Sequence, residues 1–409
     1  MLRNDANEII TRSIAAVLPD EAVRRALNDW KLPAGRLYLA AVGKGAWQMA
    51  RCAAEVLQGR LTDGVCITKY GHVAGEIPGV RCFEAGHPVP DENTVAATSA
   101  LLDMVTGLQT EDGVLFLLSG GGSALFEKPL VPLEALQDIT RQLLACGADI
   151  REINTIRKRL SAVKGGRFAQ ACAPAQVYAV ILSDIIGDPL DMIASGPACP
   201  DSATCDQARA VAEKYDLRLT PEARALLDQE TPKELSNVTT VVTGSVTQLC
   251  QAAADACRAL GYEPVILTAS LDCEAREAGS FLAAVARDHQ DAKGSVAWIA
   301  GGETVVHLTG KGLGGRNQEL ALAAAAGIAG CRDTAVFSVG SDGTDGPTDA
   351  AGGYADGETA GKLAAAGWNI HQVLADNDAY HALKAVDGLI VTGPTGTNVN
   401  DVAVALIRR

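Results

Sequence analysis

The sequence has no long apolar run and fewer basic than acidic residues. No segment approaches the roughly 18 uncharged apolar residues that mark a membrane helix, and residues 1–10 are too polar for a signal peptide. The 35 Lys and Arg residues face 49 Asp and Glu residues, giving a formal net charge of −14. Nonspecific nucleic-acid binding requires a basic surface. We therefore expect neither a membrane nor nucleic acid among the partners of this chain.

Aromatic residues are scarce, and the cysteines form no recognisable pattern. Aromatics make up 4% of the residues and hydrophobic residues 48%, so Ala, Val, Leu and Ile must fill the core. The 11 cysteines include no Cys-x-x-Cys pair, so neither a zinc ribbon nor a disulfide framework follows from them. Reduced, mostly buried thiols in a cytoplasmic protein fit this usage best.

Several common catalytic signatures are missing as well. The six histidines show no metal-ligand spacing, and no Gly-x-Ser-x-Gly elbow indicates an acyl-transfer triad. No P-loop sequence occurs in the chain. Gly43-Lys44-Gly45 follows a predicted strand but is an incomplete dinucleotide fingerprint, because Gln48 stands where the third glycine belongs. Lys44 is placed to neutralise a phosphoryl group, and the alternative is an ordinary surface lysine.

Apolar runs alternate with helical segments along most of the chain. Residues 5–29 are predicted to form one helix, and residues 37–42, 114–118 and 177–183 are continuous apolar runs of strand length. Such runs, separated by helices, predict a parallel sheet covered on both faces. The polar segment 215–237 is the candidate domain junction. Beyond it the alternation resumes, with predicted strands at 239–243, 264–267, 296–300, 335–339 and 389–392.

The most informative stretch directly follows the apolar run 114–118. It consists of Ser119, Gly120, Gly121, Gly122 and Ser123, and we call it the glycine loop. Consecutive glycines accept positive φ angles, so their backbone N–H groups can turn toward one ligand. A helix that begins near the end of the loop would add its dipole. We predict an anion site here; the alternative is a tight strand-to-helix turn without a ligand.

A basic segment follows at residues 151–167. It contains six cations and a single acid, Glu152, in an otherwise acidic protein. Arg157, Ser161 and Lys164 are spaced to share one helical face. This face is either an ordinary solvated one or a patch that gathers an anionic substrate.

Aspartates follow several predicted strands. Asp184 and Asp188 come after one strand, and Asp342 and Asp345 come after another. Oxygen ligands of this kind suit Mg²⁺ held by a nucleotide, although aspartate is also a common turn former. Arg316 stands at the start of a predicted helix, where a cation opposes the dipole. A bound anion would explain its position.

Ten motifs, in order along nearly the whole chain, resemble those of one known family. They are Gly43-Lys44, His87-Pro-Val-Pro-Asp91, Leu118-Ser-Gly-Gly-Gly-Ser-Ala-Leu125, Asn154-Thr-Ile-Arg-Lys-Arg-Leu-Ser-Ala-Val-Lys-Gly-Gly166, Ser183-Asp-Ile-Ile-Gly-Asp188, Ala194-Ser-Gly-Pro197, Gly301-Gly-Glu-Thr304, Gly314-Gly-Arg-Asn-Gln-Glu319, Ser341-Asp-Gly-Thr-Asp-Gly346 and Gly393-Pro-Thr-Gly-Thr-Asn398. On these motifs the sequence resembles the glycerate 2-kinases of the MOFRL type.

The resemblance implies ATP-dependent phosphorylation of D-glycerate on its 2-hydroxyl, giving 2-phosphoglycerate. It also implies two α/β domains, the N-terminal one Rossmann-like with a mostly parallel sheet, and an active site in the cleft between them. We place the boundary at 1–236 and 237–409 and leave a chain crossover open. The family's proposed catalytic lysine and arginine correspond to Lys44 and Arg316.

The remaining candidate residues are assigned to binding. The glycine loop, Arg157 and Lys164 are expected to hold substrate or phosphate. Mg²⁺ is the expected metal, with ATP, near Asp184, Asp188, Asp342 and Asp345. We expect a monomer or homodimer. Two alternatives are an NAD(P)H-dependent hydroxypyruvate reductase, a label often attached to this family, and a noncatalytic binder of small sugar acids.

Overall fold

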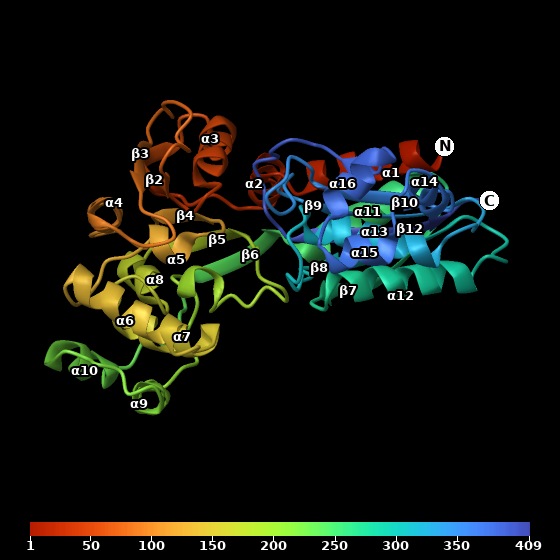
Figure 1. The fold of residues 1–409 in the computed structure, drawn as a ribbon. Coiled ribbons are helices and arrows are strands. Elements are labelled where there is room, and N and C mark those ends of the chain that lie inside the picture. The colour runs from red at the N-terminus through yellow and green to blue at the C-terminus, as the bar shows by residue number, and fades with distance from the viewer. The chain divides into compact units, whose positions relative to one another are not determined.

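The computed structural model describes all residues, 1–409, and the chain forms two compact α/β units (Figure 1). Unit 1 comprises Met1–Glu21, Ser183–Gly187 and Gly244–Arg409, and unit 2 comprises Ala22–Leu182 and Asp188–Thr243. This grouping differs from the predicted boundary at residues 236 and 237, because the first helix and a short central segment belong with the C-terminal part. None of the helices combines the length and the apolar character that crossing a bilayer requires.

Unit 2 is built on a six-stranded sheet in the order β3-β2-β1-β4-β5-β6. The pairs from β3 through β5 are parallel, which confirms the predicted Rossmann-like sheet. The strand order reverses between β1 and β4, so the two strands flank the switch point of a doubly wound fold. The strands are β1 Leu37–Val42, β2 Leu61–Lys69, β3 Arg81–Ala85, β4 Gly113–Leu118, β5 Gln176–Leu182 and β6 Val238–Gly244.

The two central strands are buried along their whole length, as their apolar sequences predict. Helix α3 (Ala46–Leu57) packs on β1, β2 and β4, and helix α4 (Glu92–Met104) packs on β2 and β3. The expected single helix at residues 5–29 is wrong. It is two helices, α1 (Leu2–Ala16) and α2 (Pro19–Asn28), because Pro19 begins a new helix and cannot continue the old one.

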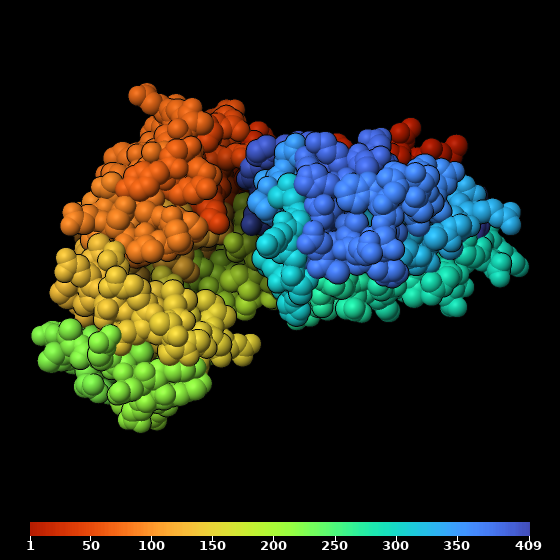
Figure 2. Space-filling view, viewed as in Figure 1, coloured from red at the N-terminus to blue at the C-terminus, as the bar shows by residue number.

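Unit 2 also contains a helical lobe with its own apolar core. Its members are α6 Leu133–Ala145, α7 Ile150–Arg159, α9 Cys205–Lys214 and α10 Pro221–Leu227. Helix α8 (Arg167–Cys172) instead packs on β5. Leu136, Ile156 and Leu227 belong to one buried cluster of this lobe, and the corresponding yellow and green surfaces adjoin in Figure 2. The whole predicted junction at residues 215–237 lies inside unit 2, where α10 packs against α7 and α9.

Unit 1 contains a mixed six-stranded sheet in the order β11-β10-β9-β12-β8-β7. Only β7 and β8 are parallel, and the other pairs are antiparallel. Two of its strands, β10 and β12, were not expected from the sequence. The strands are β7 Glu263–Leu271, β8 Val296–Gly302, β9 Thr334–Gly340, β10 Gly352–Asp356, β11 Leu389–Ile390 and β12 Asp401–Ile407.

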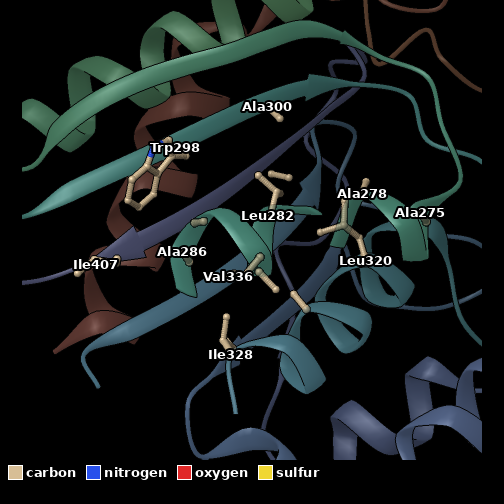
Figure 3. Close-up of a cluster of buried hydrophobic side chains, with 14 residues drawn as sticks. Ala275, Ala278, Leu282, Ala286, Trp298, Ala300, Leu320, Ile328, Val336 and Ile407 are labelled. Atoms are coloured by element: carbon tan, nitrogen blue, oxygen red, sulfur yellow. The ribbon is translucent and has the colours of Figure 1, made fainter. Parts of the chain in front are cut away.

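Helices α12 (Ala275–Asp288) and α13 (Arg316–Gly327) cover one face of this sheet, and α1 and α11 (Val246–Ala259) form a second layer. Figure 3 shows the core under α12 and α13, where small alanines alternate with larger side chains such as Trp298 and Leu282. A Cβ at Gly279 would lie 2.1 Å from the carbonyl oxygen of Leu320, so glycine permits the close approach of the two helices. The short helices are α5 Gly122–Leu125, η1 Ile193–Ser195, α14 Thr359–Ala365, α15 Ile370–Ala375 and α16 Ala379–Ala385.

Candidate functional site

The loops after β1 and β4 meet at the switch point of the unit 2 sheet. Val42 and Leu118, the last residues of the two strands, are register partners, so the following loops leave the same sheet edge. The Lys44 N–H donates to the carbonyl of Gly120 at 2.8 Å. The Gly45 N–H donates to Oγ of Ser119 at 3.0 Å. Ligands of open α/β sheets bind at this edge.

Glycine is required at two points of this contact. Gly43 has a φ of 123°, and a Cβ there would lie 2.3 Å from Oγ and 2.5 Å from the carbonyl oxygen of Ser119. Gly121 has a φ of 84°, and a Cβ there would lie 3.1 Å from the His87 ring and from Cγ of Lys44. Both positions therefore combine a left-handed backbone with a crowded neighbour.

The glycine loop presents free backbone donors beside a lysine. The N–H groups of its last four residues, 120–123, donate to no acceptor within the protein. Helix α5 is a single turn, so the expected dipole of a longer helix is absent. The successive N–H groups of the loop are the candidate donors to an anion. The Lys44 ammonium has no acidic partner in the structure. Burial, together with Lys44 and Lys69 nearby, lowers the pKa of His87, which leaves its ring neutral at pH 7.

The basic segment 151–167 points largely inward. The Lys164 side chain is fully buried, with Nζ 3.1 Å from Oε2 of Glu127 and donating to the carbonyl of Phe126 at 2.7 Å. Burial lowers the pKa of Lys164 to about 8, and Glu127 opposes that effect. Arg157 donates to the carbonyl of Ser123 at 3.1 Å. Arg157 thus holds the backbone of the glycine loop at Ser123, whereas Lys164 is buried and pairs with Glu127.

Two neighbouring cations of this segment are also internal. Nζ of Lys158 lies 3.0 Å from Oδ1 of Asp201. The buried Arg159 pairs with Glu230 at 3.1 Å. The prediction that Arg157, Ser161 and Lys164 share one helical face is wrong, because α7 ends at Arg159 and the other two residues lie beyond it. Binding of substrate by Arg157 and Lys164 stays a prediction.

A second group of candidate residues lies in unit 1, at the edge where three strands meet. Asp401, the first residue of β12, is the register partner of both Gly302 and Gly340, which end β8 and β9. The N-terminus of α13 lies at the same edge and carries Arg316. Arg316 donates from Nε to Oδ2 of Asp401 at 2.6 Å and from Nη2 to Oδ1 at 3.1 Å.

A second carboxylate completes the contacts of Arg316. Its Nη1 donates to Oε1 of Glu303 at 2.8 Å, and the Glu303 side chain is 48% exposed. Burial acts to lower the pKa of Arg316, but the pairs with Asp401 and Glu303 outweigh it and raise that pKa. The anion expected beside Arg316 is therefore supplied by the chain itself. Sequence reasoning missed Asp401, although it directly precedes the apolar run 402–407.

Asp345 organises the start of α13. Its carboxylate accepts from the N–H groups of Asn317 at 3.1 Å and Gln318 at 2.9 Å. Burial raises the pKa of Asp345 to about 6, despite these hydrogen bonds. Asp342 accepts from the Thr344 N–H at 2.9 Å within its own turn.

These contacts decide how well the predicted aspartates fit a metal ion. No group of three or more His, Cys, Asp or Glu side chains is arranged to hold one. Asp345 is engaged by α13, and Asp342 is engaged in its turn. Asp184 belongs to unit 1 and Asp188 to unit 2. The aspartates therefore form no ready-made metal site.

A groove of about 830 Å³ lies beside Arg316 within unit 1. Arg316, Glu303, Asp272 and Thr344 line it, together with glycines between residues 310 and 315. A Cβ at Gly315 would lie 2.2 Å from the Asp345 carboxyl carbon. The glycines therefore let the backbone pass close to the acidic side chains at the start of α13.

The raised pKa of Asp345 predicts a pH dependence of stability. The folded protein binds this proton more tightly than the unfolded chain, whose ordinary value is 3.8, so the free energy of unfolding falls as pH rises from about 4 to about 6. Asp345→Asn cannot titrate in that window. Urea unfolding at several pH values should show wild type losing roughly 3 kcal/mol relative to Asp345→Asn, since two pKa units correspond to about that free energy. A difference that does not change with pH would contradict the raised pKa.

Free backbone N–H groups beside an unpaired lysine give this α/β protein a candidate anion site at the switch point of its Rossmann-type sheet. Comparison with known proteins narrows the class of this α/β protein. Residues 5–228 match a domain of unknown function, DUF4147, and residues 296–401 match the MOFRL family. The chain is 52% identical to the D-glycerate 2-kinase of Thermotoga maritima, covering 99% of this chain and 98% of that protein.

Structures and other relatives agree with this assignment. A crystal structure of glycerate kinase from Thermotoga maritima superposes with a TM-score of 0.96 at 52% identity, covering 99% of both chains. A protein named putative hydroxypyruvate reductase from Agrobacterium vitis is 37% identical, covering 91% of this chain and all of that protein. The chain belongs to the glycerate 2-kinase family of the MOFRL type.

Proposed function

We propose that the protein is an ATP-dependent glycerate 2-kinase that converts D-glycerate to 2-phosphoglycerate. The observation that carries this proposal is the unpaired Lys44 beside the free N–H groups of the glycine loop. Phosphoryl transfer asks mainly for positioning and for neutralisation of charge on the phosphoryl oxygens. A lysine without an acidic partner, next to free backbone donors, meets that demand. The full-length similarity to proteins named glycerate 2-kinase supports the substrate.

Lys44 and the glycine loop have distinct tasks in this proposal. The Lys44 ammonium neutralises the transferring phosphoryl group. The loop N–H groups bind either the glycerate carboxylate or a phosphate, since both are anions of suitable size. The carbonyl of Lys44 accepts from Oγ1 of Thr68 at 3.3 Å, which restrains the backbone of the lysine. Arg157 holds the far side of the loop through Ser123.

Arg316 is the second residue of the proposed phosphoryl clamp. Asp401 fixes the plane of its guanidinium through two hydrogen bonds, as in other bidentate pairs. Glu303 occupies the remaining nitrogen and is the more exposed partner, with 48% of its side chain accessible against 9% for Asp401. We infer that a ligand anion displaces Glu303 while Asp401 keeps Arg316 oriented.

Magnesium enters the proposal with the nucleotide. A divalent cation of this kind usually keeps several waters and binds through substrate phosphates and one or two carboxylates, and it would neutralise charge on the nucleotide. Because the predicted aspartates form no ready-made site, we derive no step through the metal. A cytoplasmic location and a monomeric or homodimeric state also stay predictions.

The glycine loop offers a test of the anion site. Gly121→Ala places a methyl group against His87 and Lys44, and we expect kcat/KM to fall by roughly 10²-fold, the cost of misplacing a reacting group by about 1 Å. Gly59→Ala is the matched control, because Gly59 has a similar φ of 75° but no neighbour within 4 Å. It should lose some stability and keep its activity. Equal activity of the two variants would contradict a role of the loop.

The alternative function is an NAD(P)H-dependent hydroxypyruvate reductase. The strand order of unit 2 and the name of the Agrobacterium vitis relatives favour it. Against it, Gln48 in α3 occupies the position of the third glycine of the dinucleotide fingerprint. Two parallel incubations separate the functions: ATP, Mg²⁺ and D-glycerate should release ADP, and NADH with hydroxypyruvate should show no oxidation. Oxidation without ADP release would overturn the proposal.

A further inference from the structure

Two cysteines stand side by side on neighbouring strands of unit 2. Cys66 on β2 and Cys82 on β3 are register partners of a parallel pair, so both side chains project from the same face of the sheet. Register partners on adjacent strands lie about 4.7–4.9 Å apart. Disulfides need Cα atoms about 4.4–6.8 Å apart. The spacing therefore permits a covalent bond between two residues that are free thiols in the structure.

The two thiols differ in access and in acidity. Cys66 is buried, whereas Cys82 lies on the edge strand of the sheet and is partly exposed. The neighbouring Cys66 thiol lowers the pKa of Cys82, although burial opposes that effect. The neighbouring Cys82, together with burial, raises the pKa of Cys66. Thiolate character thus concentrates on the more accessible sulfur, as in redox-sensing cysteines with a neighbouring resolving thiol.

We propose that Cys66 and Cys82 form a redox-active dithiol, which a peroxide converts to an intramolecular disulfide. The Cys82 thiolate attacks hydrogen peroxide, takes one oxygen and, with one proton, releases water to become a sulfenic acid. The Cys66 thiol then attacks that sulfur and displaces the oxygen as a second water. Two thiols and one peroxide therefore give one disulfide and two waters. Two external thiols reverse the reaction by exchange and become a disulfide themselves.

Other cysteines supply internal controls. Cys146 and Cys273 are more exposed than Cys82, and neither lies on a strand. If exposure alone decided oxidation, they would react first. If the paired geometry decides it, Cys82 reacts before them and only Cys82 becomes linked to Cys66.

The test treats the full-length wild-type protein with limiting hydrogen peroxide. The protein is then alkylated under denaturing conditions, digested without reductant and mapped by mass spectrometry. We expect a peptide pair linked through Cys66 and Cys82 to become the main oxidised product, and to disappear after dithiothreitol. In Cys66→Ser, Cys82 should instead be captured as a sulfenic acid by dimedone. Free Cys66 and Cys82 at a dose that oxidises Cys146 and Cys273 would overturn the proposal.

Discussion

Lys44→Ala is expected to lower turnover by about 10²–10³-fold, the usual effect of losing one charge-stabilising donor at a reacting group. We expect a fall in turnover of this size because no acidic side chain forms an ion pair with the Lys44 ammonium. The full positive charge is therefore available to the phosphoryl group. The fold should survive, since the backbone contacts of Lys44 with Gly120 and Thr68 do not involve its ammonium. Steady-state kinetics with ATP and D-glycerate measures the loss.

Arg316→Ala should cause a loss of similar order, with one difference. The Asp401 carboxylate is nearly buried, and removing Arg316 leaves it without an ion-pair partner. This variant should therefore also lose stability. Lys31→Ala is a control of the same charge change, because Lys31 is exposed and borders a pocket at the beginnings of β4 and β5, away from the glycine loop that follows β4. Kinetics and urea unfolding on all three variants separate catalysis from folding. Near-wild-type activity of both Lys44→Ala and Arg316→Ala would refute the proposed clamp.

Lys164→Met is expected to destabilise the protein by about 3–5 kcal/mol, because it leaves Glu127 as an unpaired buried charge. Both side chains of this ion pair are fully buried. The double variant Lys164→Met/Glu127→Leu removes both charges and fills their volume with apolar atoms. It should recover most of the lost stability, since replacing a whole buried pair is often neutral. Urea unfolding of the single and double variants measures both effects.

An exposed ion pair provides the matched control. Lys214 lies 2.6 Å from Glu152, and its side chain is 57% exposed. Lys214→Met should therefore change the free energy of unfolding by less than about 1 kcal/mol. If Lys164→Met is no more destabilising than Lys214→Met, the buried pair does not stabilise this part of unit 2.

The sheet of unit 2 was predictable because its signals are local. The apolar runs that form β1, β4 and β5 each predict a buried strand, and the helices between them predict that these strands are parallel. The glycine loop and Gly43 could be placed at one sheet edge for the same reason. The hydrogen bonds from the Lys44 N–H to Gly120 and from the Gly45 N–H to Ser119 show a close approach that the sequence does not specify.

The parts that could not be predicted depend on contacts between distant segments. Asp401 meets Arg316 because β12 inserts antiparallel between β8 and β9, and no short-range pattern specifies that insertion. Lys164 lies beyond the end of α7 at Arg159, and its environment is set by Glu127, far earlier in the chain. The grouping of α1 with unit 1 likewise follows from tertiary packing, including the hydrogen bond between Tyr262 and Asp5 at 2.6 Å.

Identification of the product tests the central claim most directly. The protein is incubated with ATP, Mg²⁺ and D-glycerate, and the phosphorylated product is assigned by phosphorus and proton nuclear magnetic resonance. We predict 2-phosphoglycerate, formed only when ATP and glycerate are both present and depleted in Lys44→Ala. The appearance of 3-phosphoglycerate, or of no phosphorylated glycerate, would contradict the account.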